Sequence, residues 1–398
     1  MTGRLILNNG DVVSGEEILH DGSVVIQGEK IAQIFPSREL NKKKGDRVVD
    51  CSDSFICPGF IDIHNQGGGG FSVMDGTWDS IKGLAQVHAR HGTTGLLLTP
   101  LVETEGFRKL LPQLSGMIGK ETGGAAILGI HAEGPFINPE KKGAMPAGAI
   151  HHPDTALFEE ILAHGDGKIK EMTIAPELPG ALDLILQLAR RGVVPSLGHS
   201  NATLGDVLRA IDYGASHVTH MYNAMSPLHH REPGLTGASL YSSDLTVELI
   251  ADGWHIHPWI LGLTFQNKGS SRTCLITDAS PVMGLTDGAY ETLGNHVILE
   301  SGRVTLAGNP GTLAGSAISM DRAVANMINM VGVTISDAVT MASATPSAIL
   351  GLENRKGWIA PGYDADIVVL DRTYQTTCTI VGGKIVYKKD FKNLKSEG

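Results

Sequence analysis

Apolar and polar positions along the middle of the chain describe a series of buried strands separated by helical segments. Eight short apolar runs stand at residues 60–63, 94–99, 126–131, 172–175, 193–197, 217–219, 247–251 and 274–277. Segments with helical periodicity lie between most of them, for example at 181–190 and 204–213. Near-continuous apolar strands with helical crossovers are typical of a parallel sheet covered on both faces. Eight such strands predict an α/β fold, a (β/α)8 TIM-like barrel.

The two ends of the chain have a different sequence pattern, one of short strands separated by turns. Strand-like runs broken by turn residues occupy 5–7, 23–27 and 30–34, and again 366–370, 377–381 and 384–387. Asp21-Gly22 and Gly382-Gly383 supply turns between them. We therefore predict a small β-sandwich domain formed by both termini, from residues 1–55 and 359–398. The barrel domain then spans residues 56–358.

The charge and composition of the chain argue against nucleic acid or a membrane as a partner. The formal net charge is −10, and the longest basic run is Lys42–Lys44, so no basic stripe for nucleic acid or an anionic membrane is evident. The apolar runs are far shorter than the ~20 residues of a membrane span, and the first residues lack the pattern of a signal peptide. The cysteines are too few and too scattered for a disulfide framework: Cys51, Cys57, Cys274 and Cys378. We expect a cytoplasmic protein with a small-molecule partner.

Carboxylate and imidazole side chains follow the predicted strands. Such groups are Asp62 and His64 after the first strand, His131 and Glu133 at the third, His199 at the fifth, His220 at the sixth, Asp252 and His255 at the seventh and Asp278 at the eighth. In a barrel these strand ends meet on one face, where active sites are built. A single histidine there is more often structural, but a carboxylate after an apolar strand is costly to bury unless it is paired or metal-bound. Together these groups predict a site for zinc or a similar divalent ion.

Several segments resemble a known family. They are PGFIDIHNQG (58–67), HAEGPF (131–136), SLGHSNA (196–202), THMYNAM (219–225), REPGLTG (231–237), DGWH (252–255), TDA (277–279) and GTLAGS (311–316). Their order and spacing resemble those of N-acetylglucosamine-6-phosphate deacetylases. The segment at 356–371, KGWIAPGYDADIVVLD, resembles the closing segment shared across the amidohydrolase superfamily.

The resemblance implies a metal-dependent deacetylase. Carried over by position, Glu133, His199 and His220 would be the metal ligands and Asp278 the catalytic acid/base. Zinc is the expected ion, with iron, manganese or cobalt as alternatives. Many superfamily members carry His-x-His after the first strand and bind a second metal there. This chain has His64 and Gln66 at those positions. We therefore expect one firmly bound ion per subunit, with the second site weak or absent.

The resemblance also implies a set of substrate contacts. Asn223 and Ala224 would bind phosphate, together with Arg231 contributed by the partner subunit of a homodimer. Contacts to the sugar would come from Ala144, His255, Leu313, Ala314 and Gly315. Methionine stands at position 145, where the family commonly has a histidine that touches the sugar. Met145 cannot replace its hydrogen bonds, so either a neighbour such as His151 or His152 compensates or the sugar preference differs.

Three alternatives to hydrolysis of N-acetylglucosamine 6-phosphate follow. The first is deacetylation of a related sugar phosphate such as the galactosamine epimer. The second is a cyclic-amide hydrolase, which the sequence disfavours because those enzymes commonly use a lysine after the fourth strand, whereas this chain has Ala175-Pro176-Glu177. The third is a non-catalytic relative. The sequence disfavours it because the three expected ligands and the expected acid/base are all present: Glu133, His199, His220 and Asp278.

Overall fold

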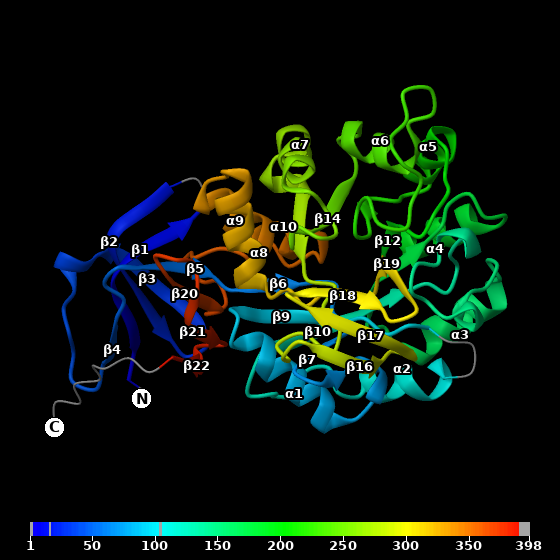
Figure 1. Cartoon of the computed structure of the whole chain (residues 1–398). Helices are drawn as coiled ribbons and strands as arrows, with labels where there is room; N and C mark the ends of the chain where they lie inside the picture. The colour runs from blue at the N-terminus through cyan, green and yellow to red at the C-terminus, as the bar shows by residue number, and fades with distance from the viewer. Residues whose placement is uncertain (1–2, 16, 103–105, 390–398) are drawn as a thin grey trace.

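The computed structural model describes residues 3–15, 17–102 and 106–389. Its centre is a sheet of eight parallel strands in the order β15-β14-β13-β12-β11-β10-β9-β6 (Figure 1). The strands are β6 (Phe60–Asp62), β9 (Thr93–Leu98), β10 (Ala126–Glu133), β11 (Ile169–Ile174), β12 (Val194–Leu197), β13 (His217–Val218), β14 (Thr246–Ile250) and β15 (Thr273–Ile276). Each of the eight predicted runs overlaps one of these strands, and the predicted barrel is confirmed.

The last strand returns to the first just beyond their C-terminal ends. Asn65 and Ala279 form a parallel bridge, and the Asp278 N–H donates to the His64 carbonyl at 2.9 Å. The buried Asp62 carboxylate accepts hydrogen bonds from the Thr277 N–H at 3.1 Å and the Thr277 hydroxyl at 2.6 Å. Because these contacts tie β15 to β6, the strand ends form one ring.

Helices surround this sheet and connect its strands. They are α1 (Trp78–Ala89), α2 (Phe107–Ser115), α3 (Thr155–His164), α4 (Ala181–Arg190), α5 (Leu204–Asp212), α6 (Gly234–Tyr241), α7 (Pro258–Lys268), α8 (Met320–Asn326), α9 (Ile335–Ala342) and α10 (Ala344–Ile349). Helices α4 and α5 coincide with the two predicted helical segments. Helix α5 begins at a capping box, in which Thr203 accepts from the Asp206 N–H and Asp206 accepts from the Thr203 N–H.

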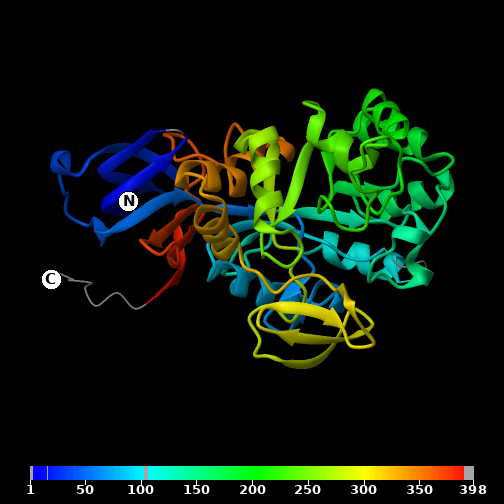
Figure 2. The same cartoon turned by 45° about the horizontal axis from the view of Figure 1, so that its top comes forward.

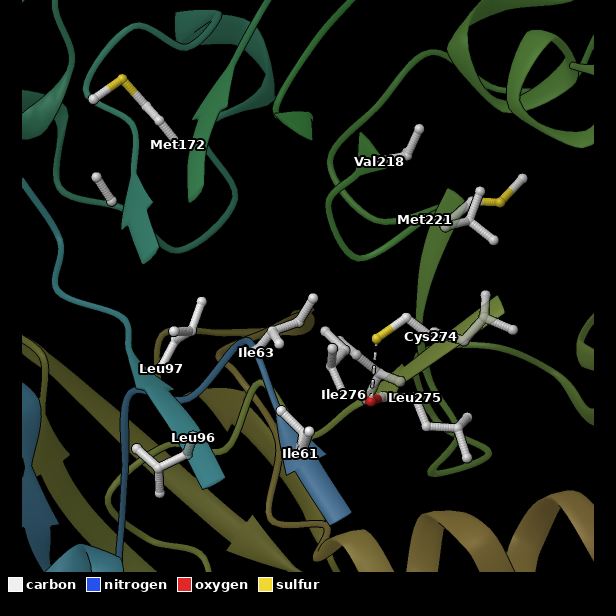
Figure 3. Close-up of a cluster of buried hydrophobic side chains, with 14 of the residues drawn as sticks. Ile61, Ile63, Leu96, Leu97, Met172, Val218, Met221, Cys274, Leu275 and Ile276 are labelled. Atoms are coloured by element: carbon white, nitrogen blue, oxygen red, sulfur yellow. Dashed lines mark hydrogen bonds between the residues drawn. The ribbon is translucent and has the colours of Figure 1, made fainter. Parts of the chain in front are cut away.

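The largest hydrophobic core joins the barrel strands to these helices. Figure 3 shows a part of it, in which strand side chains such as Ile61, Leu96, Leu97 and Ile276 gather, all between 0% and 2% exposed. Each such aliphatic side chain contributes about 1.5–3 kcal/mol when it is fully buried. This packing gives the strand ends a rigid support.

The strands at the two ends of the chain form a second sheet. Its order is β22-β21-β20-β5-β1-β2-β3, with β4 also paired to β1. The strands are β1 (Leu5–Ser14), β2 (Glu17–Gln27), β3 (Lys30–Pro36), β4 (Arg47–Asp50), β5 (Ser54–Pro58), β20 (Ile367–Asp371), β21 (Thr376–Val381) and β22 (Lys384–Lys388). In Figure 1 the blue N-terminal and red C-terminal strands lie together at one end of the molecule. The predicted β-domain from both termini is confirmed.

Four antiparallel strands inserted after β15 were not predicted. They are β16 (Gly288–Thr292), β17 (Asn295–Glu300), β18 (Arg303–Leu306) and β19 (Asn309–Leu313), paired in that order. We call this sheet the flap; in Figure 2 it is drawn in yellow and projects from the barrel. Its own small core includes Val282, Val297, Leu299 and Val304. Separately, none of the helices in the described ranges is long and apolar enough to cross a membrane.

Candidate metal centre and active site

The site is built from residues that follow the barrel strands. Glu133 is the last residue of β10, whereas His199, His220 and Asp278 each stand two residues beyond their strands. These three have left-handed backbone conformations, with φ of 48°, 28° and 45°. Non-glycine residues held in such conformations cost about 1–3 kcal/mol each and cluster at functional sites. The strand ends are therefore bent so that these side chains meet above the barrel.

Glu133, His199 and His220 bring three ligand atoms together. The Glu133 Oε1 atom lies 3.1 Å from His199 Nε2 and 3.3 Å from His220 Nε2, and the two Nε2 atoms lie 3.0 Å apart. Four-coordinate zinc with bonds of about 2.0–2.1 Å requires ligand atoms roughly 3.3 Å apart, which these distances match. All three side chains are buried, at 3–4% exposure. The arrangement fits one divalent ion with a further position open toward the cavity.

Hydrogen bonds outside the triad orient its members. His199 Nδ1 faces the Lys141 carbonyl at 2.7 Å, which leaves Nε2 for the metal position. Burial alone would raise the pKa of Glu133, but the charge of His64 and the hydrogen bonds from His199 and His220 hold it well below its usual value. Burial lowers the pKa of His220. An ionised carboxylate facing a neutral imidazole is the protonation state that metal binding requires.

Asp278 lies beside this triad. Its Oδ1 atom is 3.5 Å from His64 Nε2 and has no hydrogen-bond partner within the described part of the chain. Burial raises the pKa of Asp278 to about 7. A carboxyl group with a pKa near neutrality is suited to accept and return a proton. Gly315 packs on its backbone, since a Cβ there would stand 3.1 Å from the Asp278 carbonyl oxygen.

His64 and Gln66 occupy the predicted second metal position. The Gln66 amide donates to Glu133 Oε2 at 2.8 Å, so the triad's free carboxylate oxygen is already engaged. His64 Nε2 lies 3.6 Å from the same oxygen, and its Nδ1 lies 3.1 Å from Glu248 Oε2. Burial lowers the pKa of His64, but the surrounding carboxylates of Glu248, Asp278 and Glu133 raise it well above the usual value. A histidine ring whose pKa is raised and an amide donor therefore stand where a second ion would lie.

A cavity of about 410 Å³ opens above the triad. This volume suits a small molecule, since ligand pockets measure about 300–1,000 Å³. Seven of the predicted substrate contacts line it: Ala144, Asn223, Ala224, His255, Leu313, Ala314 and Gly315. His255 Nδ1 is held by Asp252 at 2.6 Å. The predicted phosphate contact Arg231 does not line this cavity; it is exposed, and its guanidinium contacts His230 at 2.9 Å.

The cavity wall also contains residues that the sequence did not single out. The flap contributes Thr292, Leu293, Asn295 and Val297. The Asn295 amide donates to the Ala144 carbonyl at 3.2 Å, which fixes the flap to the loop that carries Met145. The signal that could have found part of the flap is Ser301-Gly302, a dipeptide typical of turns, between the strand-like runs at 295–300 and 303–306.

Met145 is part of the same wall. It is 5% exposed and packs in an apolar cluster with Leu101, Ile137 and Leu293. Among the described residues that line the cavity, neither His151 nor His152 is present. The first alternative, compensation by His151 or His152, thus has no support in the wall, and Met145 presents an apolar surface there.

Comparison with known proteins places the chain in a family. Residues 55–386 match the amidohydrolase family, and the chain belongs to it. Amidohydrolases are hydrolases that depend on a divalent metal, which agrees with the cluster of Glu133, His199 and His220.

Its relatives within that family agree with the resemblance seen in the sequence. The N-acetylglucosamine-6-phosphate deacetylase of Bacillus subtilis is 36% identical over 97% of this chain and 98% of its own length. An N-acetylgalactosamine-6-phosphate deacetylase of Escherichia coli O157:H7 is 38% identical over 81% of this chain and 85% of its own. A mutant N-acetyl-D-glucosamine-6-phosphate deacetylase of Mycobacterium smegmatis, solved in complex with N-acetyl-D-glucosamine-6-phosphate, matches with a TM-score of 0.90. It is 32% identical, over 96% of this chain and 99% of that one. The predicted family is confirmed.

Proposed function

We propose that this chain removes the N-acetyl group of N-acetyl-D-glucosamine 6-phosphate, giving D-glucosamine 6-phosphate and acetate. The observation that carries the proposal is the meeting of Glu133, His199 and His220 beside Asp278 in one cavity. Relatives named for this activity align over nearly the whole chain, which supports the choice of substrate. The reaction belongs to the catabolism and recycling of amino sugars.

The chain's own groups have separate tasks in this reaction. Glu133, His199 and His220 would hold the ion, which when bound supplies Lewis-acid activation of water and of the acetyl carbonyl. Asp278 would take a proton from the attacking water at its carboxylate and deliver it to the departing amine. Asp252 engages His255 Nδ1, which leaves Nε2 available to the amide. The walls of the cavity would exclude bulk water from this exchange.

Residues on two sides of the cavity would contact the phosphate and the sugar. Asn223 and Ala224 line the cavity beside His220, and Ala144, Leu313, Ala314 and Gly315 line its other side. Arg231 would supply a planar guanidinium for phosphate oxygens from the partner subunit of a homodimer. Its exposure and its position outside the cavity of its own subunit are compatible with that role.

We propose one ion in the active site, with zinc expected and iron, manganese or cobalt as alternatives. Two imidazoles and a carboxylate suit zinc, and the Gln66 amide on Glu133 Oε2 opposes a second ion at His64. A cytoplasmic location is supported by the four unpaired cysteines. The proposed domain limits are 1–55 with 359–398 for the β-domain and 56–358 for the metal-dependent hydrolase barrel.

Acetate release from N-acetylglucosamine 6-phosphate, measured with and without a chelator, tests the proposal. We expect turnover that the chelator abolishes and zinc restores. No acetate release from the metal-loaded protein would reject the substrate, and release that persists after full metal removal would reject the metal centre. The unphosphorylated sugar is the matched control, because it lacks the group that Asn223 and Arg231 would bind.

The galactosamine epimer is the second candidate substrate. A relative named as an N-acetylgalactosamine-6-phosphate deacetylase is 38% identical. The apolar Met145 lies in the cavity wall, where it would face the sugar. The ratio of kcat/KM for the two epimers decides between the candidates. We expect the glucosamine compound to be preferred.

A further inference from the structure

Glu248 lies inside the barrel, directly beneath the metal centre. It is the middle residue of β14, its side chain is fully buried, and it does not line the cavity. A carboxylate in such a place is costly unless hydrogen-bond donors satisfy it. Two donors engage its Oε2 atom, and both belong to the active site. Its Oε1 atom has no hydrogen-bond partner within the described residues and lies 3.6 Å from His217 Nε2.

The first donor is the backbone of a metal ligand. Glu248 Oε2 accepts the His220 N–H at 2.8 Å, and the Glu248 main-chain carbonyl accepts the next amide, that of Met221, at 3.0 Å. His220 has a φ of 28°, a conformation that a bulky residue keeps only when its surroundings enforce it. Glu248 therefore holds two consecutive N–H groups of the turn that aims the His220 ring at Glu133.

The second donor is the ring of His64. Its Nδ1 lies 3.1 Å from the same Glu248 Oε2 atom. With Nδ1 engaged, His64 Nε2 faces Glu133 Oε2 at 3.6 Å and Asp278 Oδ1 at 3.5 Å. One oxygen of Glu248 thus connects the turn of a metal ligand with the ring that faces both Glu133 and Asp278.

We propose that Glu248 is a positioning residue, which holds His220 in its metal-binding conformation and fixes the His64 ring between Glu133 and Asp278. The inference rests on the proposed metal-dependent function. It assigns a role to a residue that touches neither the cavity nor the ion. Partners of this kind typically change metal affinity or activity by about 10- to 100-fold when they are removed.

Glu171 offers a matched control. It lies in β11, is equally buried, and faces the same interior, with Oε1 3.7 Å from His131 Nε2 and 3.8 Å from His217 Nε2. Neither of its oxygens has a hydrogen-bond partner within the described ranges. His217 Nε2 also lies 3.6 Å from Glu248 Oε1, so the two carboxylates meet at this ring. Replacing Glu171 removes a buried carboxylate from the barrel without removing the hydrogen bonds that Glu248 Oε2 accepts from His220 and His64.

The experiment compares Glu248→Met, Glu248→Gln and Glu171→Met in the full-length, zinc-loaded protein. Zinc affinity is measured by chelator competition without substrate, and kcat and KM are measured separately. We expect Glu248→Met to lose about 10- to 100-fold in zinc affinity and in kcat. Its KM should stay within about twofold, because Glu248 does not reach the cavity. Glu248→Gln should be largely rescued, since its amide oxygen can accept both hydrogen bonds. Glu171→Met should bind zinc and turn over like the original protein.

Two results would overturn the proposal: unchanged zinc affinity and kcat in Glu248→Met, or equal losses in Glu248→Met and Glu171→Met. If Glu248→Met does not fold, Glu248→Asp carries the same test, because its shorter side chain withdraws the acceptor from His220. Zinc affinity is read without any sugar. A loss in Glu248→Met that is absent from Glu248→Gln and Glu171→Met therefore supports the positioning role even if the proposed substrate is not turned over.

Discussion

The replacement Asp278→Asn gives a prediction whose size follows from burial. The Asp278 carboxyl has its pKa raised to about 7 in the folded, metal-free protein, compared with 3.8 as the ordinary value. Between these pH values the folded state binds more protons than the unfolded state. The free energy of unfolding therefore falls as the pH rises through that window. Asparagine has the same shape and does not ionise.

The expected magnitude comes from the shift itself. Each pKa unit corresponds to 1.36 kcal/mol, so a change from 3.8 to about 7 amounts to about 4 kcal/mol. Below pH 4 the metal-free wild type and Asp278→Asn should unfold at similar free energies. Above pH 7 the variant should be the more stable by up to about 4 kcal/mol. With zinc bound the difference should shrink, because the carboxylate then lies near a cation.

Urea unfolding of the metal-free proteins at several pH values between 5 and 8 measures this difference. Asp364→Asn is the matched control: burial alone would raise the Asp364 pKa, but hydrogen bonds from Lys30 and Arg355 lower it to about 2. That carboxylate is ionised in both states from pH 5 to 8, so its replacement should cost the same free energy throughout. If the Asp278→Asn difference did not change with pH, the reasoning about its burial would be refuted. Turnover of Asp278→Asn should fall by about 10²–10⁴-fold while sugar binding persists.

Three further predictions concern the metal, the phosphate and the sugar. Removing the ion should lower the midpoint of thermal unfolding and zinc should restore it, because the ion binds only the folded triad; an unchanged midpoint, followed by calorimetry, would count against that site. Arg231→Ala should raise KM with little change in kcat. At substrate far below KM, an equal mixture with Asp278→Asn should reach about a quarter of the wild-type rate, since half of the dimers are mixed and each mixed dimer keeps one intact site. No recovery after subunit exchange would place the arginine in its own subunit. Met145→His should change the ratio of kcat/KM between the two epimers by about tenfold, as measured by acetate release; an unchanged ratio would remove Met145 from substrate selection.

The barrel could be predicted because its strands are buried on both faces. Leu96, Leu97 and Leu98 are all fully buried, so β9 appears as an unbroken apolar run. The meeting of Glu133, His199 and His220 could be predicted because each stands within two residues of the end of such a run, and the barrel brings these positions together. Their selection as the metal ligands came from the family resemblance. The β-domain was visible through turn residues that separate short strands.

The flap and the polar interior of the barrel could not be predicted in the same way. Strands β16 and β17 expose many of their side chains, Ile298 among them at 36%, so their pattern does not indicate a buried sheet. Glu248 and His217 lie within runs that were interpreted as apolar strands. In such strands, periodicity does not distinguish a side chain that faces the barrel interior from one that faces the helices. Their role follows only from the contacts that the fold creates.

The pairing of strands from opposite ends of the chain has a consequence for biosynthesis. Strand β5 pairs along its whole length with β20, with Pro58 opposite Ile367. While the ribosome makes the intervening barrel, the nascent chain can form the β1–β2–β3 hairpins, but that side of β5 keeps its backbone groups free. An open strand edge invites pairing with other chains. Aggregation during translation should therefore be most severe for chains released before β20 is made, and a holdase chaperone should protect them.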